Sequence, residues 1–182
     1  MSKGRSRKGQ SRAIGAAFEE ELAWLHQQYN ANGFALMRHN GTQATMRGEE
    51  WIPQDSPPDY TGLITCQNGR YVSFDAKQRN SAHYYHARNK LHQTQKLWED
   101  QQAGGIAFLL VLVDAYLGGT PRAWVLWPQE YWQDHYPAWS LNLPLTGSID
   151  PAIAVEVPRW DRVSHGFIPD WLKVIHPALV WP

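Results

Sequence analysis

The chain has 182 residues, 43% of them hydrophobic, and a formal net charge of zero at pH 7. This length predicts one well-packed domain and leaves little room for a second. The longest apolar run, Ile106–Val113, is far shorter than the ~18 residues that cross a bilayer, and the N-terminus is basic and polar rather than an apolar export signal. We therefore expect a soluble, cytoplasmic protein with no membrane partner.

The single cysteine, Cys66, excludes an internal disulfide and a cysteine-based metal cluster, which fits a reducing cytosol. We expect it to be a small buried residue. No phosphate-binding loop of the GxxxxGK[ST] type is present, so a nucleotide cofactor is not expected.

Positive charge gathers at the N-terminus before any acidic residue occurs, at Lys3, Arg5, Arg7, Lys8 and Arg12. With glycine and serine between these charges, residues 1–12 are predicted to form a disordered basic arm that lies along DNA phosphates. A tail that only aids solubility explains the same composition.

The first expected element is a helix from about Ile14 to Asn30, because apolar residues recur there at three- and four-residue spacing. Asn32 and Gly33 are suitable helix-ending residues, and residues 34–38 follow as a short strand. Residues 39–58 have no clear period and contain several glycines and prolines, which indicates a connector with at most one small hairpin.

A hairpin is expected next, because residues 60–66 and 70–77 alternate and are rich in β-forming types, with Gln67-Asn68-Gly69 between them. A helix at about 89–102, a strand at 106–113 and another at 123–127 follow. This order predicts an α/β domain with a mixed central sheet flanked by helices.

The period of two in the second hairpin strand places Asp75 and Lys77 on one face. The position of Asp59 depends on the turn. A two-residue loop would send Asp59 to the opposite face. A three-residue loop, 67–69 with Gly69 left-handed, would pair Cys66 with Arg70, set Asp59 across from Lys77 and keep it on the face of Asp75.

We expect the three-residue loop or an equivalent bulge, because two carboxylates and a lysine at one spot have a chemical use. Carboxylate oxygens hold a hard cation, and an ammonium beside them can act on the water that the cation activates. An isolated D-x-K triplet is more often an exposed pair on a strand. The combination of Pro58-Asp59, a hairpin and Asp75-Ala76-Lys77 is what favours a metal centre.

This arrangement resembles the PD-(D/E)xK nuclease superfamily, and within it the RecU-type Holliday-junction resolvases. The resemblance extends in order from about residue 13 to residue 128 and is carried by Phe18-Glu19, Ser56–Gly62, Phe74–Lys77, Leu91-His92-Gln93 and Gly104–Phe108. The chain departs from the family in having Asp75 where Glu is usual, prolines where threonines are frequent before Asp59, and only a short stretch in place of a long stalk insertion.

The resemblance implies a restriction-endonuclease-like fold with a catalytic core at residues 13–128. The last third resembles the family only loosely, and we expect residues 129–182 to form a Trp- and Pro-rich extension that packs on the core or the dimer, within a single nuclease domain over residues 13–182. It implies that Glu19, Asp59, Asp75 and the carbonyl of Ala76 bind Mg²⁺, for which Mn²⁺ can substitute. Lys77 would orient or help to deprotonate the attacking water. Helix geometry alone does not choose among Glu19, Glu20 and Glu21, and the choice of Glu19 rests on the resemblance.

The expected DNA contacts are the N-terminal arm and a basic segment with the start of the second helix, namely Arg79, Arg88, Lys90, His92, Gln93 and Gln95. Ordinary surface polarity explains these residues nearly as well. Zinc binding by His83, His86 and His92 is disfavoured, because no CxxC accompanies them and they straddle a loop and a helix start.

The resemblance implies an endonuclease that cuts four-way junctions by paired symmetric nicks and leaves 5′-phosphate and 3′-hydroxyl ends. Two symmetric nicks favour a homodimer, with Trp124, Trp127, Trp132 and Trp139 as candidate sources of apolar surface. Two alternatives stay open: a nuclease of the same superfamily that cuts flaps, other branched DNA or duplex sites, and a DNA-binding protein with an inert site.

Overall fold

The structure is a computed structural model, and it describes residues 7–41, 44–47, 50–53, 57–79, 83–85, 91–113, 121–128, 142–144, 149, 151–160 and 168–179. Its centre is a six-stranded sheet whose strands lie in the order β1 (Leu36–His39), β4 (Tyr60–Ile64), β5 (Arg70–Arg79), β7 (Ile106–Val113), β8 (Arg122–Leu126) and β10 (Ala154–Val157). Only β5 and β7 are parallel, and the other neighbours are antiparallel.

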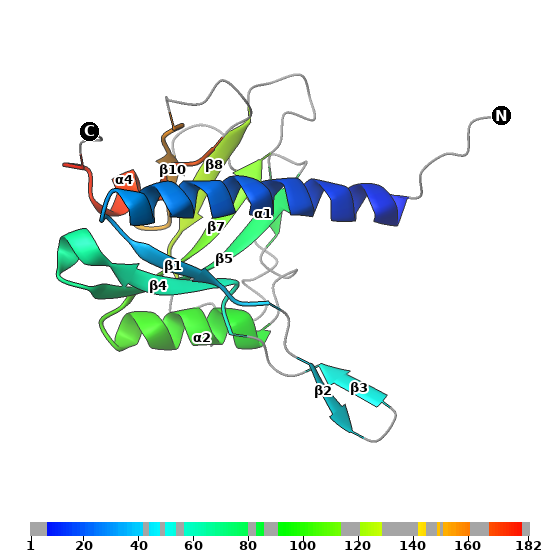
Figure 1. The fold of residues 1–182 in the computed structure, drawn as a ribbon. Helices are drawn as coiled ribbons and strands as arrows, with labels where there is room; N and C mark the ends of the chain where they lie inside the picture. Colours follow the sequence, from blue (N-terminus) through cyan, green and yellow to red (C-terminus); the bar gives the residue numbers. More distant parts are fainter. Residues whose placement is uncertain are drawn as a thin grey trace.

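Helices cover both faces of this sheet. The long helix α1 (Arg7–Ala31) and the short helix α4 (Trp171–Ile175) lie on one face, and α2 (Leu91–Gln102) lies on the other (Figure 1). The expectation of an α/β domain with a mixed central sheet is therefore confirmed. No described helix is both long and apolar enough to span a membrane.

Helix α1 packs through the stripe of Phe18, Leu22, Leu25 and Tyr29, all of them buried, as the spacing predicted. The helix begins at Arg7, however, so residues 7–12 are helical and the expectation of a disordered arm over them is wrong. Arg7, Lys8, Gln10 and Arg12 are good helix formers, and a helix anchored by its apolar stripe can continue through the Gly9 and Ser11 between them. Figure 1 shows this N-terminal part of α1 extending beyond the sheet. Lys3 and Arg5 lie outside the described residues.

The α1 face of the sheet carries a ladder of stacked rings that crosses four strands. His39, Tyr60, Phe74 and Phe108 are paired in register across β1, β4, β5 and β7. Their successive ring centroids lie 4.8, 4.9 and 4.8 Å apart. Trp171 of α4 packs on this ladder, with its ring centroid 5.3 Å from that of Phe74 and 5.6 Å from that of Phe108. The aromatic ladder joins the strands that carry the site to the helices above them.

The opposite face has a second apolar cluster, formed by Leu97 of α2 with alternate residues of β7 and β8. Polar contacts fix α2 along the sheet: the Asp100 carboxylate lies 2.9 Å from the Lys96 ammonium and accepts a 3.4 Å hydrogen bond from the Tyr71 hydroxyl. Because α2 ends beside the start of β7, its first turn lies at the other end of the sheet, where β5 ends (Figure 1).

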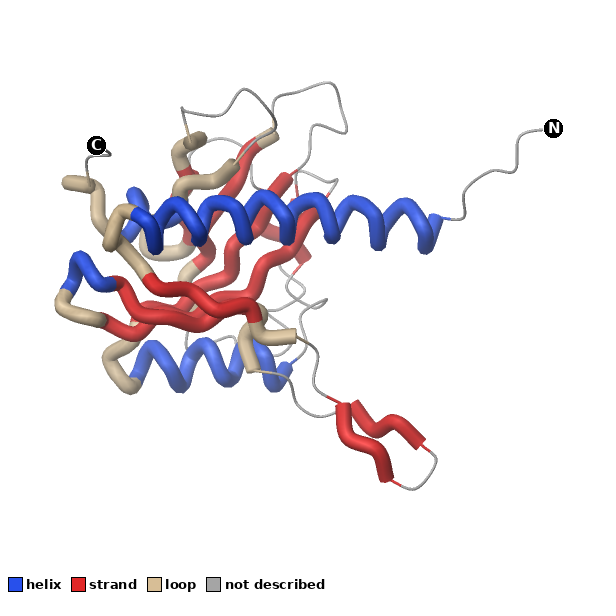
Figure 2. The backbone as a smooth tube through the Cα atoms, in the orientation of Figure 1, coloured by secondary structure: helices blue, strands red, loops and turns tan. Residues whose placement is uncertain are grey.

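The connector between β1 and β4 holds the small hairpin that the sequence allowed. Strands β2 (Ala44–Arg47) and β3 (Glu50–Pro53) pair with each other only and project away from the sheet (Figure 2). A second two-stranded pair joins β6 (His83–Tyr85) to β9 (Asn142–Pro144).

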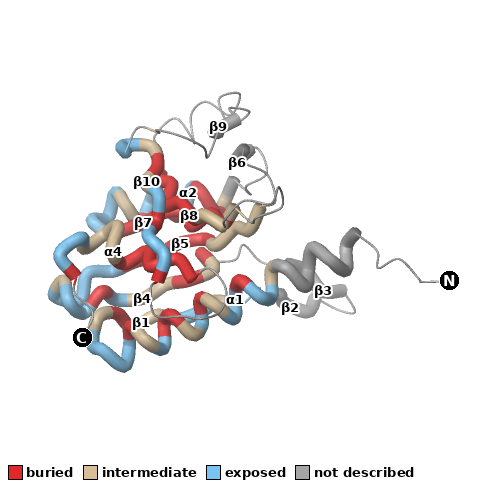
Figure 3. The backbone as a smooth tube through the Cα atoms, turned by 90° about the horizontal axis from the view of Figure 1, so that it is seen from above, coloured by how far each residue is buried: buried red, intermediate tan, exposed pale blue. Residues whose placement is uncertain are grey.

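The C-terminal part of the chain belongs to the same core. Strand β10 pairs with β8, and Trp160, Trp171 and Leu172 are buried (Figure 3). Trp124 is buried and Trp127 is partly buried, whereas Trp132 and Trp139 lie outside the described residues. Cys66, expected to be buried, is exposed, because it lies in a turn and not in a strand.

Candidate metal centre

The turn between β4 and β5 decides which side chains meet. Ile64 pairs with Arg70, so five residues, 65–69, connect the strands, and the expected three-residue loop is wrong. Thr65–Gln67 form a 3₁₀ turn that the sequence pattern did not show, followed by Asn68 and Gly69 with φ of 59° and 73°. The left-handed Gly69 is confirmed.

The longer turn shifts the register by two residues, and a shift of two keeps every side chain on its face. Extending the observed register by one pair, from Tyr60 and Phe74, sets Asp59 opposite Asp75 instead of Lys77. The essential expectation holds all the same: Asp59, Asp75 and Lys77 are gathered at one end of the hairpin.

Short polar contacts join the three side chains. The Asp59 backbone N–H donates to Oδ1 of Asp75 over 2.9 Å, and the Ala76 N–H donates to Oδ2 of Asp59 over 3.0 Å. The Lys77 ammonium lies 3.3 Å from Oδ2 of Asp59 and 3.4 Å from Oδ2 of Asp75. One lysine therefore bridges two carboxylates that come from adjacent strand ends.

The two carboxylates differ in environment. The side chain of Asp75 is 1% exposed, whereas that of Asp59 is 31% exposed. Burial raises the pKa of Asp75, and the nearby Asp59 carboxylate raises it further, while the Lys77 ammonium acts in the opposite direction. Oδ2 of Asp75 is buried, and its partner among the described residues is the Lys77 ammonium at 3.4 Å. The same ammonium also serves Asp59, so two carboxylates share one positive charge and the cluster carries a net negative charge that a further cation would offset.

These donors fit a hard divalent cation. Two carboxylates share a single ammonium, Asp59 reaches solvent, and carboxylate oxygens are the ligands that Mg²⁺ prefers. Within the described residues, no three Asp, Glu, His or Cys side chains form a group that could hold a metal. The remaining ligands would therefore be water, phosphate oxygens or the carbonyl of Ala76, which suits an ion that usually keeps several waters.

Glu19 approaches this centre from α1 on the other face of the sheet. It lines a small cavity of about 90 Å³ together with Asp59, Tyr60 and Ala76. The pKa of Tyr60 is raised by burial and then by the charges of Glu19 and Asp59, which places both acids near its hydroxyl. Glu19 and Glu20 are both exposed, but Glu20 does not line the cavity. The choice of Glu19 as a metal ligand stays a prediction.

A family model described as RecU, recombination protein U, matches residues 13–117, a span that holds every residue of this centre. This chain belongs to the RecU family. It is a RecU-type recombination protein with a restriction-endonuclease-like fold, as the resemblance implied. A search among curated proteins finds no match to the chain.

Sequence reasoning missed the residues that hold the RecU motif aspartate in place. The Asn40 backbone N–H donates to the carbonyl of Asp59 over 2.7 Å, and its amide donates to the Pro58 carbonyl over 2.9 Å and to Oγ1 of Thr61 over 3.0 Å. These bonds fasten the Pro58-Asp59 turn to the end of β1. Asn40 lies in a connector without periodicity, so only its neighbourhood in space reveals this role.

The residues expected to contact DNA are only partly described in this RecU chain. Arg79 is half-buried at the end of β5, where its Nη1 donates to the Gln78 carbonyl over 3.4 Å, and His92 is half-buried in the first turn of α2. Gln93 is 7% exposed, whereas Gln95 is exposed and donates to Glu99 over 3.3 Å. Arg88, Lys90 and His86 lie outside the described residues, as do the side chains of Arg7, Lys8 and Arg12.

Proposed function

We propose that this RecU-type protein is a Mg²⁺-dependent endodeoxyribonuclease that resolves four-way DNA junctions by paired symmetric nicks. The observation that carries the proposal is the cluster of Asp59, Asp75 and Lys77, in which two carboxylates share one ammonium and Asp75 is almost fully buried. Such a cluster keeps a net negative charge, which a divalent cation would neutralise.

Each side chain has a chemical task in this proposal. When bound, Mg²⁺ would make water a better nucleophile and stabilise charge on the scissile phosphate. Asp59 and Asp75 would hold the ion, and both carboxylates keep the Lys77 ammonium close to it. From there Lys77 can orient the attacking water or donate a hydrogen bond to a phosphate oxygen. In-line attack would release 3′-hydroxyl and 5′-phosphate ends.

Two projections flank the end of the sheet that carries the site. The N-terminal part of α1 and the β2–β3 hairpin extend past it (Figure 1). We assign phosphate contacts to the basic residues of α1 and the preceding segment, and to the basic segment 79–90 with the start of α2. The hairpin is the counterpart of the family's longer stalk. Such contacts weaken steeply with salt.

Two nicks require two sites, so the active species is proposed to be a homodimer that also accepts Mn²⁺ in place of Mg²⁺. A candidate two-fold contact is the apolar row of Leu36, Leu63 and Tyr71, which are paired across three adjacent strands and are 48%, 43% and 39% exposed. Side chains of this type in register at the edge strand β1 are suited to association. Leu63→Lys should give monomers in light scattering, whereas Gln27→Ala, an exposed position on α1, should not.

The function is tested with one sequence presented in three forms: a four-way junction, a linear duplex and a 5′ flap. We expect Mg²⁺-dependent nicking of the junction alone, abolished by EDTA and by Asp75→Asn, with junction binding retained. Nicked strands that a ligase reseals without kinase treatment carry the expected ends. Equal cutting of duplex or flap would assign another substrate, and binding with no cleavage in Mg²⁺ or Mn²⁺ would indicate an inert site.

Coupled nicking is tested on a plasmid that extrudes a cruciform. Paired incision within one dimer's lifetime gives linear plasmid, whereas independent incision gives nicked circles first. The Leu63→Lys monomer should accumulate nicked circles. This outcome separates loss of the dimer from loss of the metal centre, which would give no product.

A further inference from the structure

The aromatic ladder ends at the edge of the sheet in an exposed ring. Its three inner rings are buried, whereas His39 is exposed. At the inner end, the ring of Trp127 meets Phe108 edge-on, with centroids 6.2 Å apart. At the outer end, Tyr60 is the one ring of the described residues that packs against His39. Because β1 is the outermost strand of the sheet, no further strand of this sheet continues the ladder beyond His39.

The exposed ring is held in a fixed orientation. The imidazole of His39 lies at 25° to the Tyr60 ring with centroids 4.8 Å apart, and Tyr60 stacks in turn on Phe74 at 18° and 4.9 Å. The backbone of the next residue, Asn40, is fixed by its hydrogen bond to the Asp59 carbonyl. A ring that is already ordered loses little conformational freedom when another ring stacks on its outer face.

This end of the ladder lies beside the metal centre. His39 pairs with Tyr60, the residue after Asp59, so ordinary sheet spacing puts the Cα atoms of His39 and Asp59 about 6 Å apart. Both residues also line the small cavity that Glu19 reaches from α1. A group bound at the centre and a group stacked on His39 can therefore belong to the same stretch of DNA.

Helix α1 leaves space on this side of the sheet. Gly15 lines the same cavity one turn before Glu19, and a Cβ at this position would meet no atom within 4 Å. Glycine lowers the stability of a helix relative to alanine, and no neighbour among the described residues requires it here. The cavity itself, about 90 Å³, is too small for a nucleobase, so the surface on offer is the outer face of the His39 ring.

A flat ring with a free face beside a phosphate-cutting centre fits a nucleobase. Bases of any sequence stack on aromatic side chains, histidine included, because every base has a π face. In a linear duplex each base is already stacked on its neighbours, and taking it out of the stack costs free energy. A base at the crossover of branched DNA leaves its stack at lower cost, so such a ring favours branched over linear DNA.

We propose that His39 extends the aromatic ladder onto the DNA by stacking on a base at the crossover of a branched substrate. This inference rests on the proposed function, since it takes the DNA to be bound at the metal centre. His39 is then a substrate-binding residue that adds affinity for branched DNA without touching the ion.

The test is a double-mutant cycle on DNA binding in EDTA, measured by fluorescence anisotropy with the full chain. The probes are a fluorescein-labelled four-way junction and the same junction with abasic nucleotides at the crossover. Removing the bases should weaken binding by wild type about tenfold more than binding by His39→Ala, which has no ring to stack on. His39→Phe keeps a ring and should behave like wild type. Binding of linear duplex should be the same for all three proteins.

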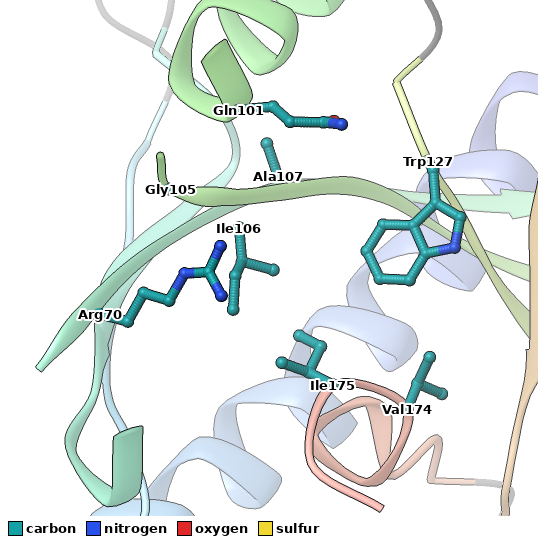
Figure 4. A pocket seen from close by; sticks show the side chains of 8 residues that line it. All are labelled: Arg70, Gln101, Gly105, Ile106, Ala107, Trp127, Val174 and Ile175. Atoms are coloured by element: carbon teal, nitrogen blue, oxygen red, sulfur yellow. The ribbon is translucent and has the colours of Figure 1, made fainter. Parts of the chain in front are cut away.

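His176→Ala is the matched control, because it removes a histidine at the other end of the sheet. His176 follows α4, whose last residue Ile175 borders a cavity of about 360 Å³ together with Arg70 and Ile106, the first residues of β5 and β7 (Figure 4). This variant should respond to the abasic junction as wild type does.

The same loss on removing the bases in wild type and in His39→Ala would overturn the proposal. A His39→Phe protein that behaves like His39→Ala, or a salt dependence whose slope falls by about one in His39→Ala, would also overturn it, since the imidazole would then contact a phosphate. Monomeric His39→Ala in light scattering would assign the ring to contact with a second copy and would count equally against it. Failure of the proposed function is distinguishable, because it appears as absent cleavage in Mg²⁺, whereas the binding cycle needs no metal.

Discussion

Adjacent residues on β5 lie in opposite environments on the two faces of the sheet. Phe74 is fully buried in the aromatic ladder, with a ring on either side of it. Asp75 is almost equally buried, but it shares one ammonium with Asp59 and its pKa is raised by burial. The face with Phe74 is filled by rings of the protein itself, whereas the face with Asp75 would, in the proposed function, be completed by a bound cation. The comparison therefore predicts a site that is less favourable without its ligand than with it.

The largest expected effect is on Asp75→Asn, which removes the buried charge. Cleavage should fall by at least about 10³-fold, because metal-assisted stabilisation is worth several kcal/mol. The metal-free variant should be at least as stable as metal-free wild type. Burial disfavours the charged form of Asp75, and a neutral amide at this position avoids that cost. Thermal unfolding checks this: a gain of about 1 kcal/mol raises Tm by about 2–4 °C in a domain of this size.

The metal response distinguishes this explanation from a folding defect. Mg²⁺ should raise the Tm of wild type and leave that of Asp75→Asn unchanged. A marked loss of Tm in metal-free Asp75→Asn would instead mean that the carboxylate stabilises the fold, and the contrast between the two faces of β5 would be lost.

The second prediction concerns the opposite face of β5, where Phe74 lies in the aromatic ladder. Phe74→Ala should lower the free energy of unfolding by about 3–5 kcal/mol, because it empties the middle of the aromatic ladder. Phe74→Leu retains most of the volume and should lose less. Urea titration measures both, with Tyr71→Ala, a more exposed position on the same strand, as the control. If Phe74→Ala cost no more than Tyr71→Ala, the ladder would not be the stabilising element.

The third prediction concerns pH. Without metal, the folded state binds a proton at Asp75 more tightly than the unfolded state, so this residue's contribution to stability is present below about pH 4 and is lost as pH rises through its raised pKa. His26 acts oppositely, because burial lowers its pKa to about 3, and its contribution is lost as pH falls from about 6.5. The Tm difference between wild type and Asp75→Asn isolates Asp75 and should change across the acidic range. A constant difference from pH 4 to pH 8 would contradict the raised pKa.

The strands and the two main helices of the core could be predicted from periodicity, because each buries one clear face. The alternation along residues 70–77 was enough to place Asp75 with Lys77. Asp59 was placed on the same face on chemical grounds, and that placement holds because the predicted and observed loops differ by two residues. The loop length was not predictable, because the turn at Thr65–Gln67 is held by its surroundings: the Cys66 N–H donates to the Phe34 carbonyl over 3.2 Å.

Contacts between distant segments could not be predicted either, because they too depend on surroundings that the local sequence does not show. Asn40 and the aromatic ladder depend on which strands are neighbours, and no local pattern encodes that. The start of α1 was misplaced because charge composition was taken to exclude a helix. The residues that carry the chemistry were found because their motif is compact, and those that position them were missed because they are scattered.

Glu19→Gln should have the smallest effect on cleavage. It tests whether a residue of α1, on the other face of the sheet, contributes to the metal centre. Glu19 shares a cavity with Asp59 and Ala76, but within the described residues it does not complete a three-residue metal group, so its part in holding the ion is indirect or made through water. We expect cleavage to fall by about tenfold, about 1.4 kcal/mol, with a higher Mg²⁺ concentration at half-maximal rate. Glu20→Gln is the matched control, since this neighbouring side chain does not line the cavity and its change should alter neither value. A loss as large as that of Asp75→Asn would make Glu19 a direct ligand, and the ion would then be bound from both faces of the sheet.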